Sequence, residues 1–380
     1  MKEAQQIVIK VGTSTLTQGT SNLSQRHILE IARQIALLHE SGKQIILVTS
    51  GSVTAGLEVL RKSKLEKSLP RKQMLSAVGQ VRLMQIWTEM FGIFGIPVGQ
   101  LLLTRGDFSQ RQGYLNVRNT LLSLFEHGVV PIINENDSVA IREIQLGDND
   151  NLSALAANLI AADLLILLTD QEGLFTADPQ IDPNAKLIPI VEHIDESIVE
   201  LAGKTTKTHG MGTGGMLTKV EAARLASHSG TPTVIASSAV PRIILDLVKG
   251  KKIGTLFLAE TTPKESRKRW LLSEKPQGEI TIDAGAEQKL LKGGASLLPV
   301  GILSVSKSFD RGAIVQITTS EGRPIAVGIA NYSQREIEKI CGKHSTEIDN
   351  LLGYNYGPEV IHRDNMTLLI QEGGSKDDRK

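Results

Sequence analysis

The chain has 380 residues, with 42 Lys and Arg against 41 Asp and Glu, 41% hydrophobic residues and a single cysteine. At roughly 150 residues per domain, this length predicts about two domains, each with its own core. The near-zero net charge excludes an overall electrostatic field that would attract nucleic acid or anionic lipid. The apolar fraction is too high for a disordered chain. One cysteine, Cys341, allows no internal disulfide or thiolate zinc site, and no apolar run is long enough for a membrane span. We therefore expect a cytoplasmic protein.

Short apolar runs alternate with helical patterns up to about residue 260. Several runs, such as IILV and LLILL, are continuously apolar, as in parallel strands buried on both faces. This predicts an α/β fold, a three-layer α/β/α sandwich with a mostly parallel central sheet. Strands are predicted at residues 7–11, 44–49, 98–103, 129–134, 164–169 and 233–236, and helices between Ser24 and Gly42 and at residues 73–91, 113–127, 152–162 and 216–228.

The pattern changes beyond residue 258. Residues 261–276 are charged and flanked by prolines, which favours a linker after a first domain at residues 1–260. Four short strand candidates and one helix candidate, residues 333–341, then predict a small, mostly β domain at residues 277–366. The polar residues 367–380 are expected to form a tail.

A parallel sheet binds ligands at the carboxyl ends of its strands, so the residues there are the first candidates. Lys10 lies at the end of the first predicted strand and is followed by a Gly-Thr-Ser turn suited to a phosphate, although an ordinary turn would look the same. Ser50 follows the second strand in a turn whose N–H groups can bind anions, or which simply caps a helix. Thr169 and Asp170 follow the LLILL strand, where a carboxylate can orient a basic catalytic group. The alternative is an ordinary turn, because aspartate and the nearby Gly173 favour turns.

Two clusters of amides and carboxylates are the most unusual feature. Asn134 and Asp137 belong to an Asn-Glu-Asn-Asp run, and Asn149 and Asp150 belong to a Gly-Asp-Asn-Asp-Asn run. Their density of donors and acceptors fits a small zwitterion, with carboxylates facing its ammonium and amides facing its carboxylate. A calcium loop is excluded because the third ligand and the following glycine of that motif are missing.

A glycine-rich stretch at residues 210–215 precedes the helix that begins near residue 216. It formally matches GxGxxG, but no apolar strand precedes it, and it is not a P-loop. Its N–H groups can wrap phosphates, and Lys219 lies one turn into the helix. Lys10 and Lys219 can thus bracket one phosphoryl group, which supplies the charge stabilisation that phosphoryl transfer mainly requires.

Such a reaction needs no general base if the acceptor is a carboxylate, which is already ionised at neutral pH. Mg²⁺ is expected on the nucleotide phosphates, without direct ligation by the protein. The chain lacks HExxH, GxSxG and CxxC motifs, which argues against zinc enzymes and serine hydrolases.

Taken in order, the motifs VIKVGTS, VTSGSVTAG, LLTRGDF, VVPIINENDSVA, GDNDNLSALAA, LLTDQEGLFTADP and GTGGMLTKVEAA resemble the amino acid kinase family, in its branch that phosphorylates glutamate. The resemblance covers nearly the whole chain, and the C-terminal segment resembles a PUA domain. Ser52 is a small departure, because many members have alanine there.

The resemblance implies ATP-dependent phosphorylation of the γ-carboxylate of L-glutamate to glutamyl 5-phosphate, the first step of proline biosynthesis, with feedback inhibition by proline. Lys10, Lys219 and Asp150 would be catalytic, Asp150 by holding the lysines, and Ser50, Asn134, Asp137 and Asn149 would bind glutamate. The implied ATP-binding residues are Lys10, Thr169, Asp170, Thr213, Gly214, Gly215, Met216, Leu217, Thr218 and Lys219.

A homo-oligomer is expected, and the labile acyl phosphate favours a partner reductase, a glutamyl phosphate reductase, that takes it directly. The alternative within the class is another carboxylate or carbamate kinase of the same fold. A different class, RNA binding through the PUA-like domain, is disfavoured by charge, because residues 276–365 hold nine Lys and Arg against eleven Asp and Glu.

Overall fold

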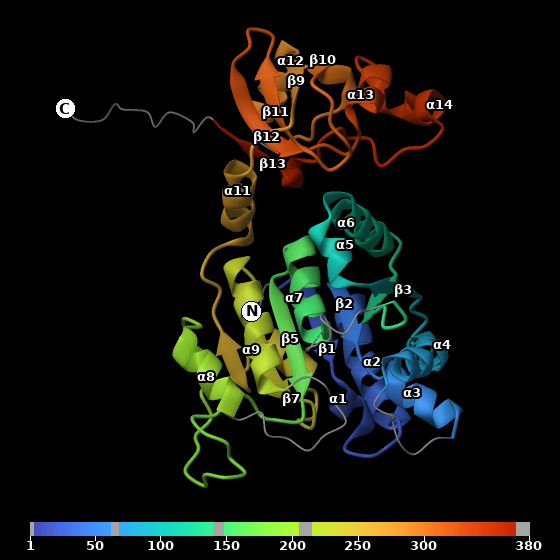
Figure 1. The fold of residues 1–380 in the computed structure, drawn as a ribbon, viewed down its shortest axis with the longest axis vertical. Helices are drawn as coiled ribbons and strands as arrows, with labels where there is room; N and C mark the ends of the chain where they lie inside the picture. Colours follow the sequence, from blue (N-terminus) through green and yellow to red (C-terminus); the bar gives the residue numbers. More distant parts are fainter. Residues whose placement is uncertain (1–3, 62–67, 140–147, 205–214, 293, 370–380) are drawn as a thin grey trace, which may run out of the picture. The chain divides into compact units, whose positions relative to one another are not determined.

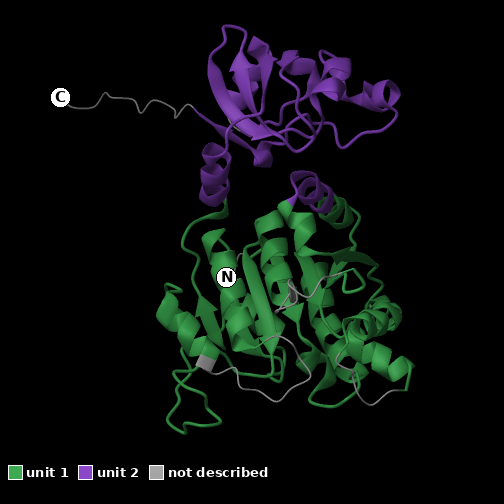
Figure 2. Cartoon of the chain, in the orientation of Figure 1, with its two compact units in different colours: residues 1–109, 120–263 green, residues 110–119, 264–380 purple. Residues whose placement is uncertain are grey.

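The structure, a computed structural model, describes residues 4–61, 68–139, 148–204, 215–292 and 294–369 (Figure 1). The chain divides into two compact units (Figure 2), one of residues 1–109 and 120–263 and the other of residues 110–119 and 264–380. Among the described helices, none is both long and apolar enough to cross a membrane.

Within its described residues, the first unit is built on an eight-stranded sheet with the order β3-β4-β2-β1-β5-β7-β8-β6. Neighbouring strands run parallel except for the pair β7 and β8, which is antiparallel. The strands are β1 (Gln6–Val11), β2 (Gln44–Thr49), β3 (Val98–Leu103), β4 (Val130–Glu135), β5 (Leu164–Thr169), β6 (Ile190–Val191), β7 (Thr233–Ser237) and β8 (Thr255–Phe257).

Helices cover both faces of this sheet, which confirms the predicted α/β/α fold (Figure 1). One face packs its alternate side chains, such as Ile7, Ile9 and Leu47, against α2, α4 and α10, and α7 and α9 lie on the strands of the other face. Because both faces of the sheet are covered, central strands such as β2 and β5 contain continuous apolar runs. The helices are α1 (Thr13–Thr17), α2 (Gln25–Glu40), α3 (Ser52–Val59), α4 (Leu69–Gly92), α5 (Arg105–Ser109), α6 (Arg111–Glu126), α7 (Asp148–Ile160), α8 (Glu196–Lys204), α9 (Met216–His228) and α10 (Ile243–Val248).

Most predicted elements are found within a few residues of their expected bounds. Strands β2, β3 and β5 and helix α9 match the prediction at both ends. The Ser24 side chain caps α2 by accepting a hydrogen bond from the His27 amide, and Gly42 follows the helix with a φ of 83°. Helix α7 begins at Asp148, four residues earlier than predicted, so Asn149 and Asp150 belong to its first turn.

Helix α3 follows the turn at Ser50, for which a helix cap was only one of two interpretations, and it contains a glycine in its interior. Gly56 is required by packing, because a Cβ atom there would lie 2.0 Å from the carbonyl oxygen of Leu75 on α4. A Cβ atom at Gly79 would likewise lie 1.8 Å from the carbonyl oxygen of Ser52. The two glycines therefore let the backbones of α3 and α4 touch, and this close approach places Ser52 beside α4.

The second unit contains, in its described part, a five-stranded sheet with the order β10-β9-β11-β12-β13. Its core is a cluster of buried apolar side chains that includes Ile280, Ile317 and Tyr332. The elements are β9 (Gly278–Ile282), α12 (Ala284–Leu291), β10 (Ile302–Ser306), β11 (Ile314–Thr319), β12 (Pro324–Ile329), α13 (Gln334–Ile340), α14 (Ile348–Leu352) and β13 (Met366–Leu368), with short 3-10 helices at Pro299–Gly301, Ser345–Glu347 and Arg363–Asn365. The mostly β character was predicted, whereas α12 and α14 were not.

The predicted linker, residues 261–276, differs in the structure, because it contains the helix α11 (Pro263–Ser273). Leu271 on this helix is fully buried and packs with Leu115 and Ile314. The sequence pattern also places residues 110–119 in the first domain, whereas they belong to the second unit. Leu115 explains this assignment, since its cluster also contains Val327 of the C-terminal sheet.

Candidate functional site

The carboxyl ends of four adjacent parallel strands carry the predicted site residues. Strands β4, β2, β1 and β5 are neighbours in the sheet, so their ends meet at one edge. Lys10 lies near the end of β1, Ser50 directly follows β2, Asn134 lies near the end of β4, and Thr169 ends β5. The first three belong to two clusters of polar contacts.

The first cluster is formed by two lysines that share one carboxylate. The Nζ atom of Lys10 lies 2.6 Å from Oδ1 of Asp150, and the Nζ atom of Lys219 lies 3.4 Å from Oδ2. Thr218 donates a hydrogen bond of 2.7 Å to the same Oδ2. Lys10 and Lys219 are each 5% exposed and Asp150 is 1% exposed, so the contacts form away from bulk water.

The charges of this cluster do not cancel, since two ammonium groups face one carboxylate. Burial and the neighbouring Lys219 lower the pKa of Lys10, while Asp150 raises it, and the pKa is lowered overall. Burial raises the pKa of Asp150, but the two lysines and the Thr218 hydrogen bond more than offset this and hold it well below its usual range. Asp150 is therefore ionised at neutral pH, and the cluster keeps a surplus positive charge suited to a phosphate.

Two helix starts position this cluster. Asp150 lies in the first turn of α7, where a carboxylate is favoured by the helix dipole. Gly215 caps α9 in an extended conformation, and its carbonyl oxygen accepts hydrogen bonds from Thr218 at 2.9 Å and from Lys219 at 3.4 Å. The start of α9 thus turns two side chains toward the start of α7.

The second cluster consists of amide and hydroxyl groups. The Nδ2 atom of Asn149 donates to Oγ of Ser50 and to Oδ1 of Asn134, each at 3.0 Å. The Glu135 amide donates to the same Asn134 oxygen at 2.9 Å and to Oδ1 of Asn149 at 3.2 Å. Asn149 and Asp150 are consecutive in α7, so one helical turn joins the amide cluster to the lysine cluster.

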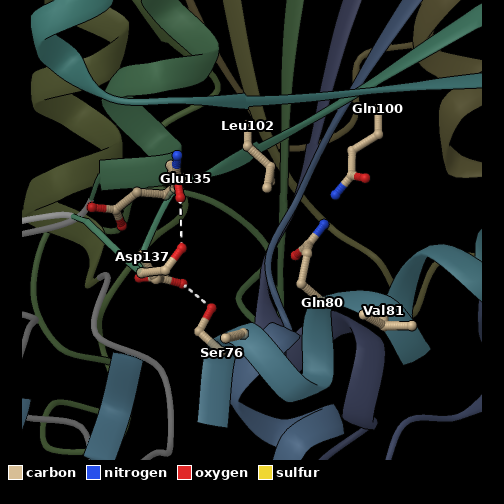
Figure 3. A pocket seen from close by; sticks show the side chains of 10 residues that line it. Ser76, Gln80, Val81, Gln100, Leu102, Glu135 and Asp137 are labelled. Carbon is tan, nitrogen blue, oxygen red and sulfur yellow. Dashed lines mark hydrogen bonds between the residues drawn. The ribbon is translucent and has the colours of Figure 1, made fainter. Parts of the chain in front are cut away.

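Asp137 forms a third group of contacts with residues of α3 and α4. Its Oδ2 atom accepts a hydrogen bond of 2.7 Å from Ser76 (Figure 3). The same atom accepts a second hydrogen bond, of 3.2 Å, from Ser52. The Nζ atom of Lys72 lies 3.8 Å from Oδ1 of the same carboxylate. Asp137 is 8% exposed, and it lines a pocket of about 270 Å³ together with Ser76 and Glu135.

The predicted nucleotide contacts are placed only in part. The hydroxyl of Thr169 donates to the carboxylate of Asp170 at 2.9 Å. Thr169 ends β5, the neighbour of β1, and Asp170 follows it. Helix α9 begins with Met216, Leu217, Thr218 and Lys219, directly after its N-cap Gly215. Met216 is buried. Thr213 and Gly214 lie outside the described residues.

The structure adds residues on α4 that sequence reasoning missed. Lys72, Ser76 and Gln80 are spaced four residues apart and reach Asp137 or Asn134. The sequence did offer a signal for these residues. Ser76 and Gln80 are polar residues at helical spacing on the face of α4 that also carries the apolar Leu83. Polar side chains on a buried face need hydrogen-bond partners, so this spacing indicates contacts with another polar segment. Among the described residues, no group of three or more His, Cys, Asp and Glu side chains is arranged to hold a metal ion.

The sequence of this chain matches the model of the amino acid kinase family over residues 5–237. The chain belongs to the amino acid kinase family. Residues 278–352 match the PUA domain, so both predicted resemblances are confirmed. The residues that match the family model include the lysine cluster around Asp150 and the amide cluster around Asn149.

Several curated proteins are similar to the chain over nearly its full length. It is 50% identical over 368 residues to a glutamate 5-kinase of Enterobacter sp. strain 638, covering 97% of this chain and 100% of that protein. It is also 50% identical over 366 residues to the glutamate 5-kinases of Escherichia coli strain K12 and of Shigella boydii, covering 96% of this chain and 99% of each. Among solved structures, a UMP kinase from Bacillus anthracis matches with a TM-score of 0.48 and 14% identity over 68% of this chain and 98% of that one. The family assignment does not depend on that structure.

Proposed function

We propose that this chain transfers the γ-phosphoryl group of ATP to the γ-carboxylate of L-glutamate, forming L-glutamyl 5-phosphate in the first step of proline biosynthesis. The observation that carries the proposal is the buried pair of lysines on Asp150, joined through α7 to the amide cluster. The 50% identity to glutamate 5-kinases over nearly the whole chain supports the same substrate.

In this reaction a carboxylate oxygen of glutamate attacks the γ-phosphorus of ATP, and the bond from that phosphorus to the bridging oxygen of ADP breaks. No proton has to be removed, because the carboxylate is ionised at neutral pH. Lys10 and Lys219 stabilise the charge on the oxygens of the transferring group. Asp150 keeps the two ammonium groups together before the phosphate arrives, which removes the need to reorganise them during the reaction.

The glutamate would lie against Ser50, Asn134, Asn149 and Asp137, with the carboxylate of Asp137 facing its ammonium group. ATP would lie near Thr169, Asp170 and the start of α9, where free helical N–H groups favour phosphates. Mg²⁺ would accompany the nucleotide and neutralise part of its phosphate charge. Feedback inhibition by proline, a homo-oligomer, a partner reductase and a cytoplasmic location also belong to this proposal.

The test is an ATP-dependent assay in which hydroxylamine traps the acyl phosphate as a hydroxamate, run in parallel with glutamate, aspartate and N-acetylglutamate. Hydroxamate is expected with glutamate alone. Comparable kcat/KM with either competitor would favour another carboxylate kinase of the same fold. No ATP-dependent hydroxamate from any of the three would overturn the proposal.

A variant extends the test to the phosphate machinery. Lys219→Ala is expected to lower kcat by about 10²-fold or more while the KM for glutamate changes little, because the lost charge acts mainly on the transition state. Lys251→Ala is the matched control, since Lys251 is an exposed lysine that pairs with Asp246 on α10. An equal loss in glutamate affinity would assign Lys219 to substrate binding.

A further inference from the structure

Gln80 is a buried amide on α4 that contacts the predicted glutamate site from behind. Its side chain is 8% exposed, and its Oε1 atom accepts a hydrogen bond of 2.7 Å from Nδ2 of Asn134. Neither the motifs at the strand ends nor the predicted helix pattern pointed to this residue. It lies one helical turn beyond Ser76, which contacts Asp137.

This hydrogen bond completes the set of contacts that fixes which way the Asn134 amide faces. Since the nitrogen of Asn134 is directed at Gln80, its oxygen faces the amide cluster, where it accepts from Asn149 and from the Glu135 amide. A rotation of the Asn134 amide by half a turn would set two donors against each other at Asn149 and two acceptors against each other at Gln80. Both contacts would then be repulsive.

The effect passes one step further along the cluster. The Nδ2 atom of Asn149 that donates to Asn134 also donates to the hydroxyl of Ser50. When the orientation of the Asn134 amide is fixed, the orientation of the Asn149 amide is fixed too, and so is the direction of the hydrogen bond from Asn149 to Ser50. In a buried network, a single misplaced amide leaves several groups without partners.

The other end of Gln80 faces a pocket and does not compete for Asn134. Its Nε2 atom is buried and has no hydrogen-bond partner among the described residues. Figure 3 shows this nitrogen pointing toward the amide of Gln100 across the pocket of about 270 Å³. Among the described residues, the hydrogen bond of the Gln80 amide is therefore the one that it accepts from Asn134.

We infer that Gln80 is a positioning residue for glutamate binding, because it holds Asn134, and through it Asn149 and Ser50, in one amide orientation. The inference rests on the proposed function, which places glutamate against these three side chains. Gln80 itself would not touch the reacting atoms. Its loss should therefore weaken the productive binding of glutamate more than it slows the phosphoryl transfer.

The experiment compares Gln80→Met with Gln100→Met. Methionine keeps the length of glutamine but offers no strong acceptor, so Gln80→Met should raise the KM for glutamate about tenfold, the effect of one lost buried hydrogen bond. kcat and the KM for ATP should change less than threefold. Gln100 is an exposed glutamine that lines the same pocket, and Gln100→Met should change the KM for glutamate less than twofold.

A double-mutant cycle separates this role from a general effect on folding. In an Asn134→Ala background, Gln80→Met should raise the KM for glutamate no further, since the side chain it acts through is absent. Gln80→Glu keeps acceptor oxygens and shape, and should therefore raise this KM less than Gln80→Met does. Thermal unfolding of each variant shows that the compared proteins are folded.

The inference would be overturned if Gln80→Met raised the KM for glutamate equally in the presence and absence of Asn134. It would also be overturned if Gln80→Met lowered only kcat, or if Gln80→Met and Gln100→Met had the same effect on this KM. If Gln80→Met does not fold, Gln80→Glu decides the matter: a KM for glutamate within threefold of the parent supports the inference, and a larger increase contradicts it. A parent chain without glutamate-dependent hydroxamate formation would instead reject the proposed function. The two failures are therefore distinguishable.

Discussion

The ammonium group of Lys10 lies 2.6 Å from the carboxylate of Asp150, and both side chains are almost completely buried. A buried ion pair of this kind adds little net stability by itself, because removing two charges from water is costly. Here the pair holds a surplus cation, since Lys219 contacts the other oxygen of the same carboxylate. The arrangement fits a site that stabilises a phosphoryl group better than one that stabilises the fold.

Removal of the Asp150 charge should damage both activity and stability. In Asp150→Asn, two buried ammonium groups lose their counter-charge, and we expect a loss of about 3 kcal/mol in the free energy of unfolding. kcat should fall by about 10²-fold or more because the lysines are no longer held together. Denaturant unfolding and steady-state kinetics measure the two effects.

The comparison variant is Thr218→Val, which removes one hydroxyl that donates to Asp150 and leaves all three charges in place. Its loss of stability should be near 1 kcal/mol, the value of one hydrogen bond. Similar losses in the two variants would show that the charge of Asp150 is not what stabilises the cluster.

The lowered pKa of Lys10 predicts an alkaline limit of activity. Below its folded-state pKa the side chain is charged and competent, and above it the side chain is neutral, so kcat/KM should fall at a pH below the ordinary value of 10.5. Between the folded pKa and 10.5 the unfolded chain binds more protons, so the contribution of Lys10 to stability rises across the window in which activity falls.

A pH profile of kcat/KM, with circular dichroism at each pH, tests this prediction. Activity should decline while the protein stays folded. In Lys10→Arg, any residual activity should not decline over this alkaline pH range, because the guanidinium stays charged. If the alkaline decline in kcat/KM coincided with unfolding in both proteins, it could not be assigned to the deprotonation of Lys10.

Gly79 should tolerate no side chain, since a Cβ atom there would lie 1.8 Å from the carbonyl oxygen of Ser52. Gly79→Ala must separate α4 from α3, and we expect a loss of roughly 3 kcal/mol in the free energy of unfolding, at the upper end for overpacking. The KM for glutamate should also rise, because Ser52 and Ser76 would move apart around Asp137.

Gly92→Ala is the matched control on the same helix, because a Cβ atom at Gly92 would meet nothing within 4 Å. It should leave the unfolding temperature unchanged or raise it slightly, as alanine favours the helix. Equal losses at the two glycines would mean that helix propensity, rather than the contact of α3 and α4, decides the outcome.

Two adjacent leucines test whether residues 263–273 form a packed helix. Leu271 is fully buried and Leu272 is 47% exposed. Leu271→Ala should destabilise the second unit by about 3 kcal/mol through a cavity beside Ile314 and Val327, whereas Leu272→Ala should cost less than about 1 kcal/mol. Limited proteolysis at α11 should accelerate in the first variant alone. Equal sensitivity would fit the solvated linker that the sequence pattern predicts.

Most helices and strands of the first unit could be predicted from the sequence, because a strand that is buried on both faces contains a continuous apolar run. Strands β2 and β5 could be bounded to the residue from such runs, whereas the edge strand β3 matched its predicted bounds although it contains Gly99 and the exposed Gln100. Helix α3 could not be bounded in this way, since Gly56 lowers its helix propensity and is explained only by the contact with Leu75. The linker prediction differed for a similar reason, because a charged helix in which only Leu271 is buried has the sequence pattern of a solvated chain.

By itself, the sequence determined the fold class, the family and the strand ends at which Lys10, Ser50, Asn134 and Thr169 lie, because all of these follow from local residue patterns. Only the tertiary structure decided that Lys10 and Lys219 share the two oxygens of Asp150, and that Ser76 and Gln80 of α4 support Asp137 and Asn134. These contacts join segments far apart in the chain. Their geometry depends on how helices pack on the sheet. The helical spacing of Ser76 and Gln80 shows that they share a face of α4, but it does not show which side chains that face contacts.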